Sequence, residues 1–325
     1  GGEFVIVTGA NSPMFDRSVN LVGSIHHWAP GVPVIFYDLG LTPPQAEDIL
    51  TWDGVQLRKF DFKRYPPHVG YMGENGTYAW RGPILEDITQ EFACSLWLDA
   101  GLELRGDIAL VKGHIAVDGA FWVTNGWPSP NKFTHPATMA YFGVKHEDLI
   151  TPQGRLEIEA CGGIQGYRRG SIQQQVVLGG YVTCLMDPAC IHPPGASKRN
   201  FRQDQTALNM ALAKYRRDLV LGSDEYLLSL AHTARKYWEH PVGKYEFPTG
   251  EDGTFRPCDR GQVVVDGRCV TCEAAGFDPY DCDDSDVLAE KEGVEYAPEL
   301  TIFIRRAFEP KPFADFLRYR LMGTI

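Results

Sequence analysis

Residues 4–10 read FVIVTGA, an apolar run of strand length that ends in small residues. A run that is apolar at successive positions is typical of a parallel strand buried on both faces of a sheet. Residues 15–28 follow, with Val19 and Val22 on one helical face. The two segments predict a strand, a turn and a helix, which together form the opening unit of an α/β sheet.

The same alternation continues along the chain. We predict strands at 32–37, 55–62 and 94–98, with helices at 42–52 and 83–92 between them. Strands that alternate with helices favour an α/β fold with a mostly parallel, Rossmann-like sheet and helices on both faces. Ligands of such sheets bind beyond the carboxyl ends of the strands. This rule selects residues 8–11, Asp38 and Asp99 as candidates.

The second half of the chain divides into further parts. We predict helices at 206–217 and 226–237, a strand at 300–304 and a helix at 312–321. The expected organisation is a main domain at 1–247 and a cysteine-rich insertion at 248–290. A C-terminal strand and helix within 291–325 would then return to the main domain.

Cysteine usage bears on the cellular compartment. Four of the eight cysteines, Cys258, Cys269, Cys272 and Cys282, crowd into the insertion, where apolar residues are few. Such a segment holds its shape only when cross-linked, so we favour a small disulfide-rich insertion. Zinc is the alternative, but the single CxxC has irregular flanking spacings. With the N-glycosylation sequon at 75–77, the cysteines indicate an oxidising, lumenal or extracellular compartment.

The bulk composition excludes several classes. The formal net charge is −11 and no Lys/Arg-rich run occurs, so we expect no nucleic-acid partner. No run of about 18 or more apolar residues is present, and we expect no membrane-spanning helix. The chain begins at Gly1-Gly2 without Met. We therefore expect the native N-terminus to lie outside this sequence, and membrane association only through an anchor there.

Asp99 ends the apolar segment LWL at 96–98. A carboxylate at the ligand edge of the sheet can bind a divalent ion that bridges a diphosphate, or accept a ribose hydroxyl. The alternative is a strand-end aspartate that caps the following turn.

Two further segments hold candidate residues. Residues 202–209 read RQDQTALN and place Asp204 and Gln205 where a helix begins. Local physics alone favours Asp204 as the N-cap of that helix. Residues 161–169 read CGGIQGYRR, and glycines such as Gly163 permit close backbone approach to a ligand or a tight turn. This segment lacks the spacing of a phosphate-binding P-loop.

The order of these segments resembles the retaining glycosyltransferases of family 8, the glycogenin and bacterial galactosyltransferase group, which have a GT-A-type fold. The similarity rests on the first strand and turn at 4–11, VIFYDLGL at 34–41, TYAWR at 77–81 ("TYAR" in the family), LWLDAG at 96–101 ("LYLDxD"), the glycine segment at 161–167 ("NsGv"), RQDQTALN at 202–209 ("QDQDxLN") and, weakly, 308–313 ("GxxKPW"). It covers roughly residues 4 to 215, and the DQ segment and the LD strand are its most specific parts.

The resemblance implies a role for each matching residue. The base and ribose of the donor would bind at Thr8, Gly9, Ala10 and Asn11, with Asp38 at the uracil or ribose edge. Arg81 would contact the phosphates or sugar of the donor, Asp99 would bind a metal or the ribose, and Gly163 would line the donor site. Asp204 would hydrogen-bond the donor sugar, Gln205 would lie against the anomeric face, and Lys311 would meet the diphosphate. Gln205 favours retention of configuration, whereas inversion would use Asp204 as a base.

Departures from the family pattern concern the metal. The second metal aspartate of the family is Gly101 here, and the second acid of the helix-start motif is Thr206. A Mn²⁺ or Mg²⁺ ion needs several oxygen ligands. Either the ion recruits Glu103 or a histidine, or a cation such as Arg81, Arg202 or Lys311 replaces it.

The sequence therefore predicts a glycosyltransferase that moves a hexose or pentose from a UDP-sugar to a glycan or glycoprotein acceptor, in the Golgi or ER lumen or after secretion. The alternative is a degenerate GT-A domain that binds glycans or acts as a scaffold. A nucleotidyltransferase is disfavoured because residues 8–13 carry no cation. Trp80, Trp122, Trp127 and Tyr78 would stack on an acceptor or, more in keeping with aromatic side chains, fill the core.

Overall fold

The computed structural model describes residues 4–70, 76–104, 106–128, 134–149, 158–197 and 200–215, and four short strands at 220–221, 228–229, 262–265 and 268–271. The strands are β1 (Phe4–Ala10), β2 (Val34–Asp38), β3 (Val55–Lys59), β4 (Cys94–Leu98), β5 (Glu103–Leu104), β6 (Ala120–Pro128), β7 (Ile158–Arg168), β8 (Val220–Leu221), β9 (Leu228–Ser229), β10 (Gln262–Val265) and β11 (Arg268–Thr271). The helices are α1 (Phe15–Trp28), α2 (Pro43–Ile49), α3 (Arg81–Glu91), α4 (Ala109–Asp118), α5 (Pro136–Phe142), α6 (Gly179–Met186), α7 (Pro188–Ile191) and α8 (Gln203–Tyr215).

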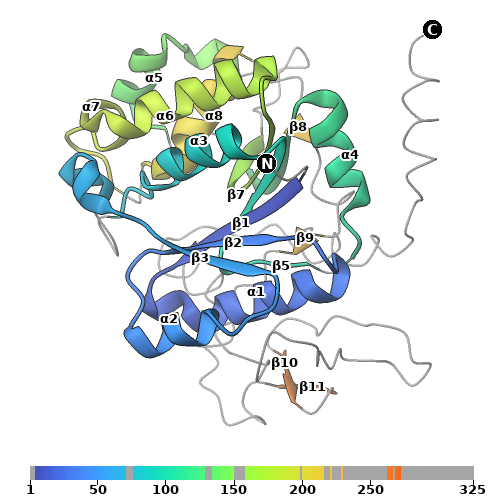
Figure 1. Cartoon of the computed structure of the whole chain (residues 1–325). Helices are drawn as coiled ribbons and strands as arrows, with labels where there is room; N and C mark the ends of the chain where they lie inside the picture. Colours follow the sequence, from blue (N-terminus) through green and yellow to red (C-terminus); the bar gives the residue numbers. More distant parts are fainter. Residues whose placement is uncertain are drawn as a thin grey trace, which may run out of the picture.

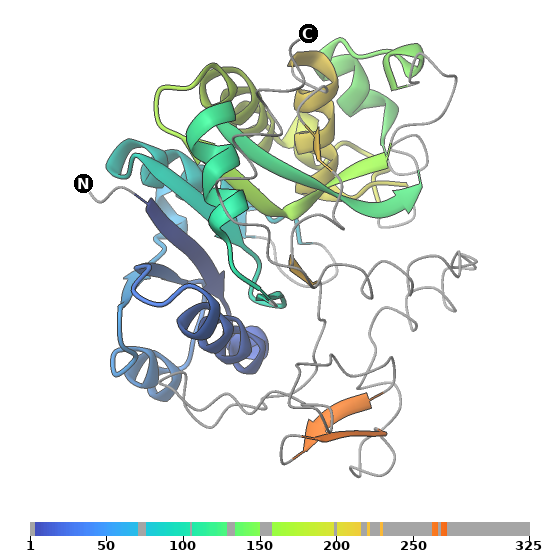
Figure 2. The same ribbon diagram turned by 90° about the vertical axis from the view of Figure 1, so that its right-hand side faces the viewer.

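The central sheet has the strand order β3-β2-β1-β4-β7-β6-β8 (Figure 1). β1 pairs in parallel with β2 and β4, and β2 pairs in parallel with β3. β7 runs antiparallel to both of its neighbours, β4 and β6, while β8 is parallel to β6. The long β6 and β7 lie side by side next to α4 (Figure 2). The predicted α/β fold with a Rossmann-like, mostly parallel sheet is confirmed.

Side chains of the central strands alternate between apolar cores on the two faces of the sheet. Val5 and Val7 pack on the face covered by α3, α6 and α8 (Figure 1). Ile6 between them packs on the opposite face, with α1 and α4. All three side chains are fully buried, and each such burial stabilises the fold by about 1.5–3 kcal/mol. The expectation of helices on both faces is confirmed.

Local signals set the ends of α2 and α4. The backbone N–H of Thr42 donates to Oε1 of Gln45 (3.0 Å), and Pro43 is the first helical residue of α2. α4 ends at Gly119, whose φ of 88° places it in the left-handed region. These caps fix where the helices meet the sheet.

Predicted and observed elements agree best in the first half of the chain. The strand predicted at 94–98 and the helix predicted at 15–28 have the bounds of β4 and α1. The helix predicted at 206–217 begins earlier, at Gln203. The helix predicted at 226–237 is wrong at Leu228–Ser229, which form β9 because they pair with β5.

Most of the predicted C-terminal organisation lies outside the described residues. Of the insertion at 248–290, the structure describes the antiparallel hairpin of β10 and β11. The elements predicted at 300–304 and 312–321 also lie outside the described residues. The division into three parts therefore stays a prediction.

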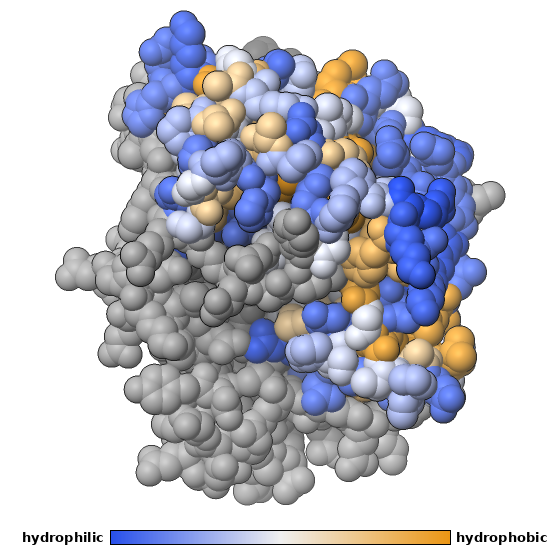
Figure 3. Space-filling model, turned by 90° about the vertical axis from the view of Figure 1, so that its left-hand side faces the viewer, coloured by the Kyte–Doolittle hydropathy of each residue, from blue (hydrophilic) through white to orange (hydrophobic). Residues whose placement is uncertain are grey.

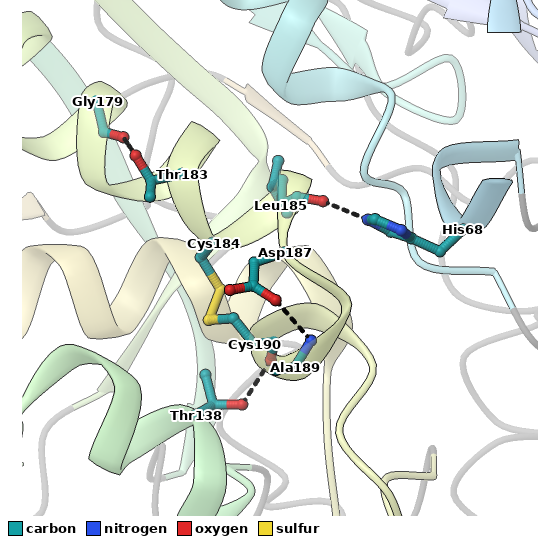
Figure 4. Close-up of a disulfide and its surroundings, with 9 residues drawn as sticks. All are labelled: His68, Thr138, Gly179, Thr183, Cys184, Leu185, Asp187, Ala189 and Cys190. Carbon is teal, nitrogen blue, oxygen red and sulfur yellow. Dashed lines mark hydrogen bonds between the residues drawn. A yellow bond between two sulfur atoms is a disulfide. The ribbon is translucent and has the colours of Figure 1, made fainter. Parts of the chain in front are cut away.

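A disulfide joins Cys184 in α6 to Cys190 in α7, with a Cα–Cα distance of 5.2 Å (Figure 4). Thr138 Oγ1 donates to the backbone oxygen of Cys190 (2.8 Å). His68 Nε2 lies 2.8 Å from the backbone oxygen of Leu185. The expected disulfide chemistry is thus found at a pair that sequence analysis did not single out, and it fixes the helices beside the ligand edge of the sheet.

Exposed apolar side chains are scattered over the described part of the surface. On the side shown in Figure 3, hydrophilic and apolar residues are interspersed. Within the described residues, the most exposed large apolar side chains, Leu50, Val117 and Ile172, come from separate segments. No helix in this part of the chain is long and apolar enough to cross a bilayer.

Candidate active site

Asp99 directly follows β4, at the edge where the carboxyl ends of β1, β2 and β4 meet. Its backbone N–H donates to the backbone oxygen of Gly163 on β7 (2.9 Å). Its Oδ1 accepts hydrogen bonds from Trp97 Nε1 and Arg81 Nη2, both at 2.6 Å. The turn after the strand is closed instead by the backbone oxygen of Asp99, which accepts from Leu102 N–H. The turn-capping alternative for this carboxylate is therefore wrong.

Arg81, the first residue of α3, lies between two carboxylates and is 3% exposed. Nη2 binds Asp99, and Nη1 binds Oδ2 of Asp204. The rings of Trp80 and Trp97 flank the guanidinium, with centroids 5.3 and 5.4 Å from its carbon. Burial lowers the pKa of Arg81, but the neighbouring charge of Asp99 raises it, and the net direction is upward. The guanidinium is a permanent cation in this site.

Asp204 and Gln205 enter the site from the first turn of α8. Asp204 is 4% exposed, and its Oδ2 accepts from Arg81 and from the hydroxyl of Tyr181 (3.0 Å). Asp204 is the second helical residue and not the N-cap, because its carboxylate binds these two donors from other helices. The N-cap interpretation is therefore wrong. Gln205 Oε1 accepts from the backbone N–H of Gly162 (3.2 Å).

The glycines of β7 lie directly against the side chains of Asp99 and Gln205. A Cβ built on Gly163 would lie 2.6 Å from Oδ2 of Asp99, and one on Gly162 would lie 3.1 Å from Cβ of Gln205. Any larger residue at Gly163 would displace the carboxylate. These glycines allow the backbone of β7 to approach the acids of the site closely, and the expected approach to a ligand stays a prediction.

A directional chain of hydrogen bonds supports Asp204 from behind. Its groups run from Trp122 Nε1 through Tyr167 OH, Gln165 and Tyr181 OH to the Asp204 carboxylate. Burial raises the pKa of Tyr181 to about 12, so its hydroxyl keeps the proton that it donates. All of these groups are fully buried apart from Asp204. The chain fixes the orientation of one acid of the site.

The series of hydrogen bonds from Trp122 to Asp204 was not predicted from the sequence. A buried glutamine between glycines, Gln165, carried a usable signal, because a polar side chain inside a strand needs a partner. Trp97, two residues before Asp99, carried another, since side chains two apart share a face. Tyr181 carried none, because its link to Asp204 exists only in three dimensions.

The turn after β1 lies beside this cluster. Val7 pairs with Trp97, so Gly9 and Asp99, two residues further on, lie at the same level. Within the described residues, the buried side-chain oxygens Thr8 Oγ1 and Asn11 Oδ1 have no hydrogen-bond partner. Buried polar atoms without partners are uncommon. Thr8 is fully buried within β1, whereas Asn11 follows β1 at the carboxyl edge, where a ligand with N–H or O–H donors would satisfy its Oδ1.

The other predicted residues of the turn have structural contacts. Ala10 is buried and pairs with Asp38 across β1 and β2. Asp38 Oδ1 accepts from the backbone N–H groups of Gly40 and Leu41, at 2.8 and 2.7 Å. A Cβ on Gly9 would lie 3.1 Å from Tyr37. Gly9 thus permits the close packing of β1 against β2.

The remaining candidates divide by burial. Trp122 and Trp80 lie in the core, as the core interpretation of the aromatic residues predicts. Tyr78 is 39% exposed beside Arg81 and has a positive φ of 53°. Lys311, Asn75 and the side chain of Trp127 lie outside the described residues.

A divalent ion held by Asp99 does not fit this arrangement. Oδ1 of Asp99 already accepts two N–H donors, one of them from a cation. In the described part of the chain, no group of three His, Cys, Asp or Glu side chains is placed to hold a metal ion.

Known proteins similar to this chain include a family of unknown function and a solved glycosyltransferase structure. A family model described as a protein of unknown function (DUF1647) matches residues 2–86, which is less than half of the chain. No curated protein matches. Among solved structures, the chain is similar to the WbbM bifunctional glycosyltransferase in its apo form, at 12% identity and a TM-score of 0.44. That similarity covers 68% of this chain but 38% of the other, so the chain spans well under half of that protein's length.

Proposed function

We propose that this chain is a glycosyltransferase that binds a nucleotide-sugar donor at the carboxyl edge of its sheet. The supporting observation is the convergence of Arg81, Asp99, Asp204 and Gln205 from α3, β4 and α8 at that edge. Carboxylate and amide oxygens held in fixed directions suit the vicinal hydroxyls of sugars and ribose. The Asn11 Oδ1, which has no hydrogen-bond partner among the described residues, lies at the end of the neighbouring strand, where the base and ribose would bind.

We further propose a UDP-sugar donor carrying a hexose or pentose, and a glycan or glycoprotein acceptor. Asp204 would hydrogen-bond the donor sugar, and Gln205 would lie against the anomeric carbon. Lys311, outside the described residues, would meet the diphosphate and stabilise the leaving group as charge develops. The Cys184–Cys190 disulfide supports a lumenal or secreted location, because disulfides persist in oxidising compartments.

Retention of anomeric configuration is part of the proposal. An inverting enzyme needs a carboxylate that takes a proton from the acceptor hydroxyl. Oδ2 of Asp204 is engaged by Arg81 and Tyr181 and is buried. A side chain held in this way suits binding and electrostatic stabilisation, whereas the neutral amide of Gln205 can flank a developing positive charge.

One observation favours a second candidate, a glycan-binding domain without catalysis. Arg81 engages both acids of the site. A site whose acids only orient sugar hydroxyls would bind a glycan with the same groups.

The test is a screen of UDP- and GDP-sugars for released nucleotide, with product anomers assigned by NMR. We expect one UDP-sugar to be turned over, and Asp204→Asn to lower the rate by about 10²–10³-fold, as loss of a charge that stabilises the transition state does. The matched control is Asp187→Asn, since Asp187 caps α7 through the N–H of Ala189 (2.9 Å) and asparagine caps equally well. No release from any donor, with no thermal shift by UDP, would leave the glycan-binding candidate.

A further inference from the structure

The charge balance at Arg81 is unusual for its position. Arg81 begins α3, where the positive end of the helix dipole disfavours a cation. The side chain is also buried, which opposes its charge. Two carboxylates from different elements, Asp99 and Asp204, supply the compensation. The three groups form one charge cluster, the Arg81 cluster.

The Arg81 cluster has the form of a cation site. Two acids converge on one positive centre at the ligand edge of the sheet, with the centre bonded to an oxygen of each. A divalent ion at Oδ1 of Asp99 would stand beside a permanent positive charge and would be repelled. The second oxygen of Asp99 faces the backbone of Gly163.

We propose that Arg81 takes the place of a divalent cation in this site, so that the nucleotide-sugar donor binds without a metal. The proposal rests on the glycosyltransferase function proposed above. Arg81 neutralises and orients the two carboxylates, and their remaining lone pairs accept from the hydroxyls of ribose and sugar. The cluster keeps one net negative charge and recognises hydroxyl groups. The diphosphate therefore binds outside the Arg81 cluster and not between the acids.

The first arm measures UDP binding to the wild-type protein by calorimetry, in EDTA and in Mn²⁺. We expect equal affinity in both. Binding in Mn²⁺ alone would overturn the proposal and leave the glycosyltransferase function standing. Binding in neither would contradict the proposed function, and the second arm then decides the role of Arg81 by itself.

The second arm measures Mn²⁺ binding directly by electron paramagnetic resonance, without nucleotide. The wild-type protein should not bind Mn²⁺ at this site. Arg81→Gln exposes two carboxylates to each other and should raise Mn²⁺ affinity by at least about tenfold, because a repelling charge within about 4 Å is removed. Arg81→Lys keeps the charge and should not. The matched control Arg58→Gln removes an arginine that binds Glu91 and should also leave Mn²⁺ affinity unchanged.

Two results would contradict the substitution of Arg81 for a metal. One is tight Mn²⁺ binding by the wild type that Asp99→Asn abolishes. The other is a folded Arg81→Gln variant with no gain in Mn²⁺ affinity. If Arg81→Gln does not fold, the wild-type protein and the Asp99→Asn variant still decide the question.

Discussion

An arginine–carboxylate interaction lies at each end of helix α3, and the two interactions differ in how far they are buried. At its first residue, Arg81 is buried between Asp99 and Asp204. At its last residue, Glu91 accepts from Nη1 and Nη2 of Arg58 on β3, at 2.6 and 2.8 Å, with the Glu91 side chain 46% exposed. Both helix ends carry the charge that the helix dipole disfavours, at a cost of about 0.3–1 kcal/mol each.

The two ends differ in whether water can hydrate a charge that has lost its partner. At the exposed end, solvent hydrates either charge if its partner is lost, so the pair adds little stability. At the other end, Arg81 and Asp204 are 3% and 6% exposed and only Asp99, at 39%, reaches solvent, so loss of Arg81 leaves the charge of Asp204 uncompensated. The buried cluster therefore fixes an arrangement of charges, whereas the exposed pair contributes little to stability.

The largest expected effect is that of Arg81→Met. It should lower the free energy of unfolding by about 3–5 kcal/mol, because Asp204 is left as a buried charge without its cation. Urea denaturation followed by circular dichroism measures the change. The control, Arg58→Met, should cost no more than about 1 kcal/mol. Equal losses at the two ends would refute the contrast drawn between them.

Tyr181→Phe tests the support of the buried end. It removes the hydroxyl that donates to Asp204 at 3.0 Å and should cost about 1.5–3 kcal/mol, the range for a hydrogen bond to a charged group. Tyr215→Phe, at a tyrosine that is 40% exposed, should change stability by less than about 0.5 kcal/mol. If both variants melt alike, the chain behind Asp204 has no energetic role.

Gly163→Ala tests the close contact between β7 and Asp99 at the buried end of α3. The added Cβ would lie 2.6 Å from Oδ2 of Asp99, and the overpacking should cost about 1–3 kcal/mol. Gly179→Ala is the matched control, because a Cβ there meets nothing within 4 Å. As an alanine in a helix it should stabilise by up to about 1 kcal/mol. Thermal unfolding distinguishes these opposite signs, and a tolerated Gly163→Ala would show that Asp99 can move.

Glu91→Gln gives the smallest effect, about 0.2–1 kcal/mol at neutral pH. The hydrogen bond from Arg58 holds the pKa of Glu91 below its ordinary value of 4.5. A carboxyl with a lowered folded pKa contributes stability above its unfolded pKa, and this contribution is lost as pH falls through the folded value. The stability difference between wild type and variant should therefore vanish in acid. A difference that persists in urea denaturation at low pH would point to packing instead.

Most strands of the sheet could be predicted because each one is a short, mainly apolar run of neighbouring residues. The runs at β1 and β4 are mostly apolar, and α1 has a clear apolar face. The placement of Asp99 at the ligand edge follows from the same rule. Arg81 and Gln205 were reached through a family resemblance, since no periodicity links residues on α3, β4 and α8.

The errors have a common physical cause. Asp204 has the sequence of an N-cap, and local reasoning sees only its own helix. Its carboxylate binds Arg81 and Tyr181 because a buried charge gains more from those donors than from exposed backbone N–H groups. Leu228–Ser229 form a strand for a similar reason, as pairing with β5 overrides helical propensity. Tertiary partners decided both outcomes.

The reversed direction of β7 has a mechanical consequence. Its glycines reach the site from the body of the strand, with Ile164 paired to Leu98 of β4 and Gln165 paired to Trp122 of β6. Gly162 and Gly163 lie beside a register shift in the pairing of β6 with β7, whereas Ile164 and Gln165 next to them lie in the sheet ladders. Residues in such ladders of a core sheet are the slowest to exchange their amide hydrogens. The starts of α3 and α8 carry no such ladders. The sheet is then the rigid reference frame of the site, and adjustment to substrates of different size falls to the two helix ends.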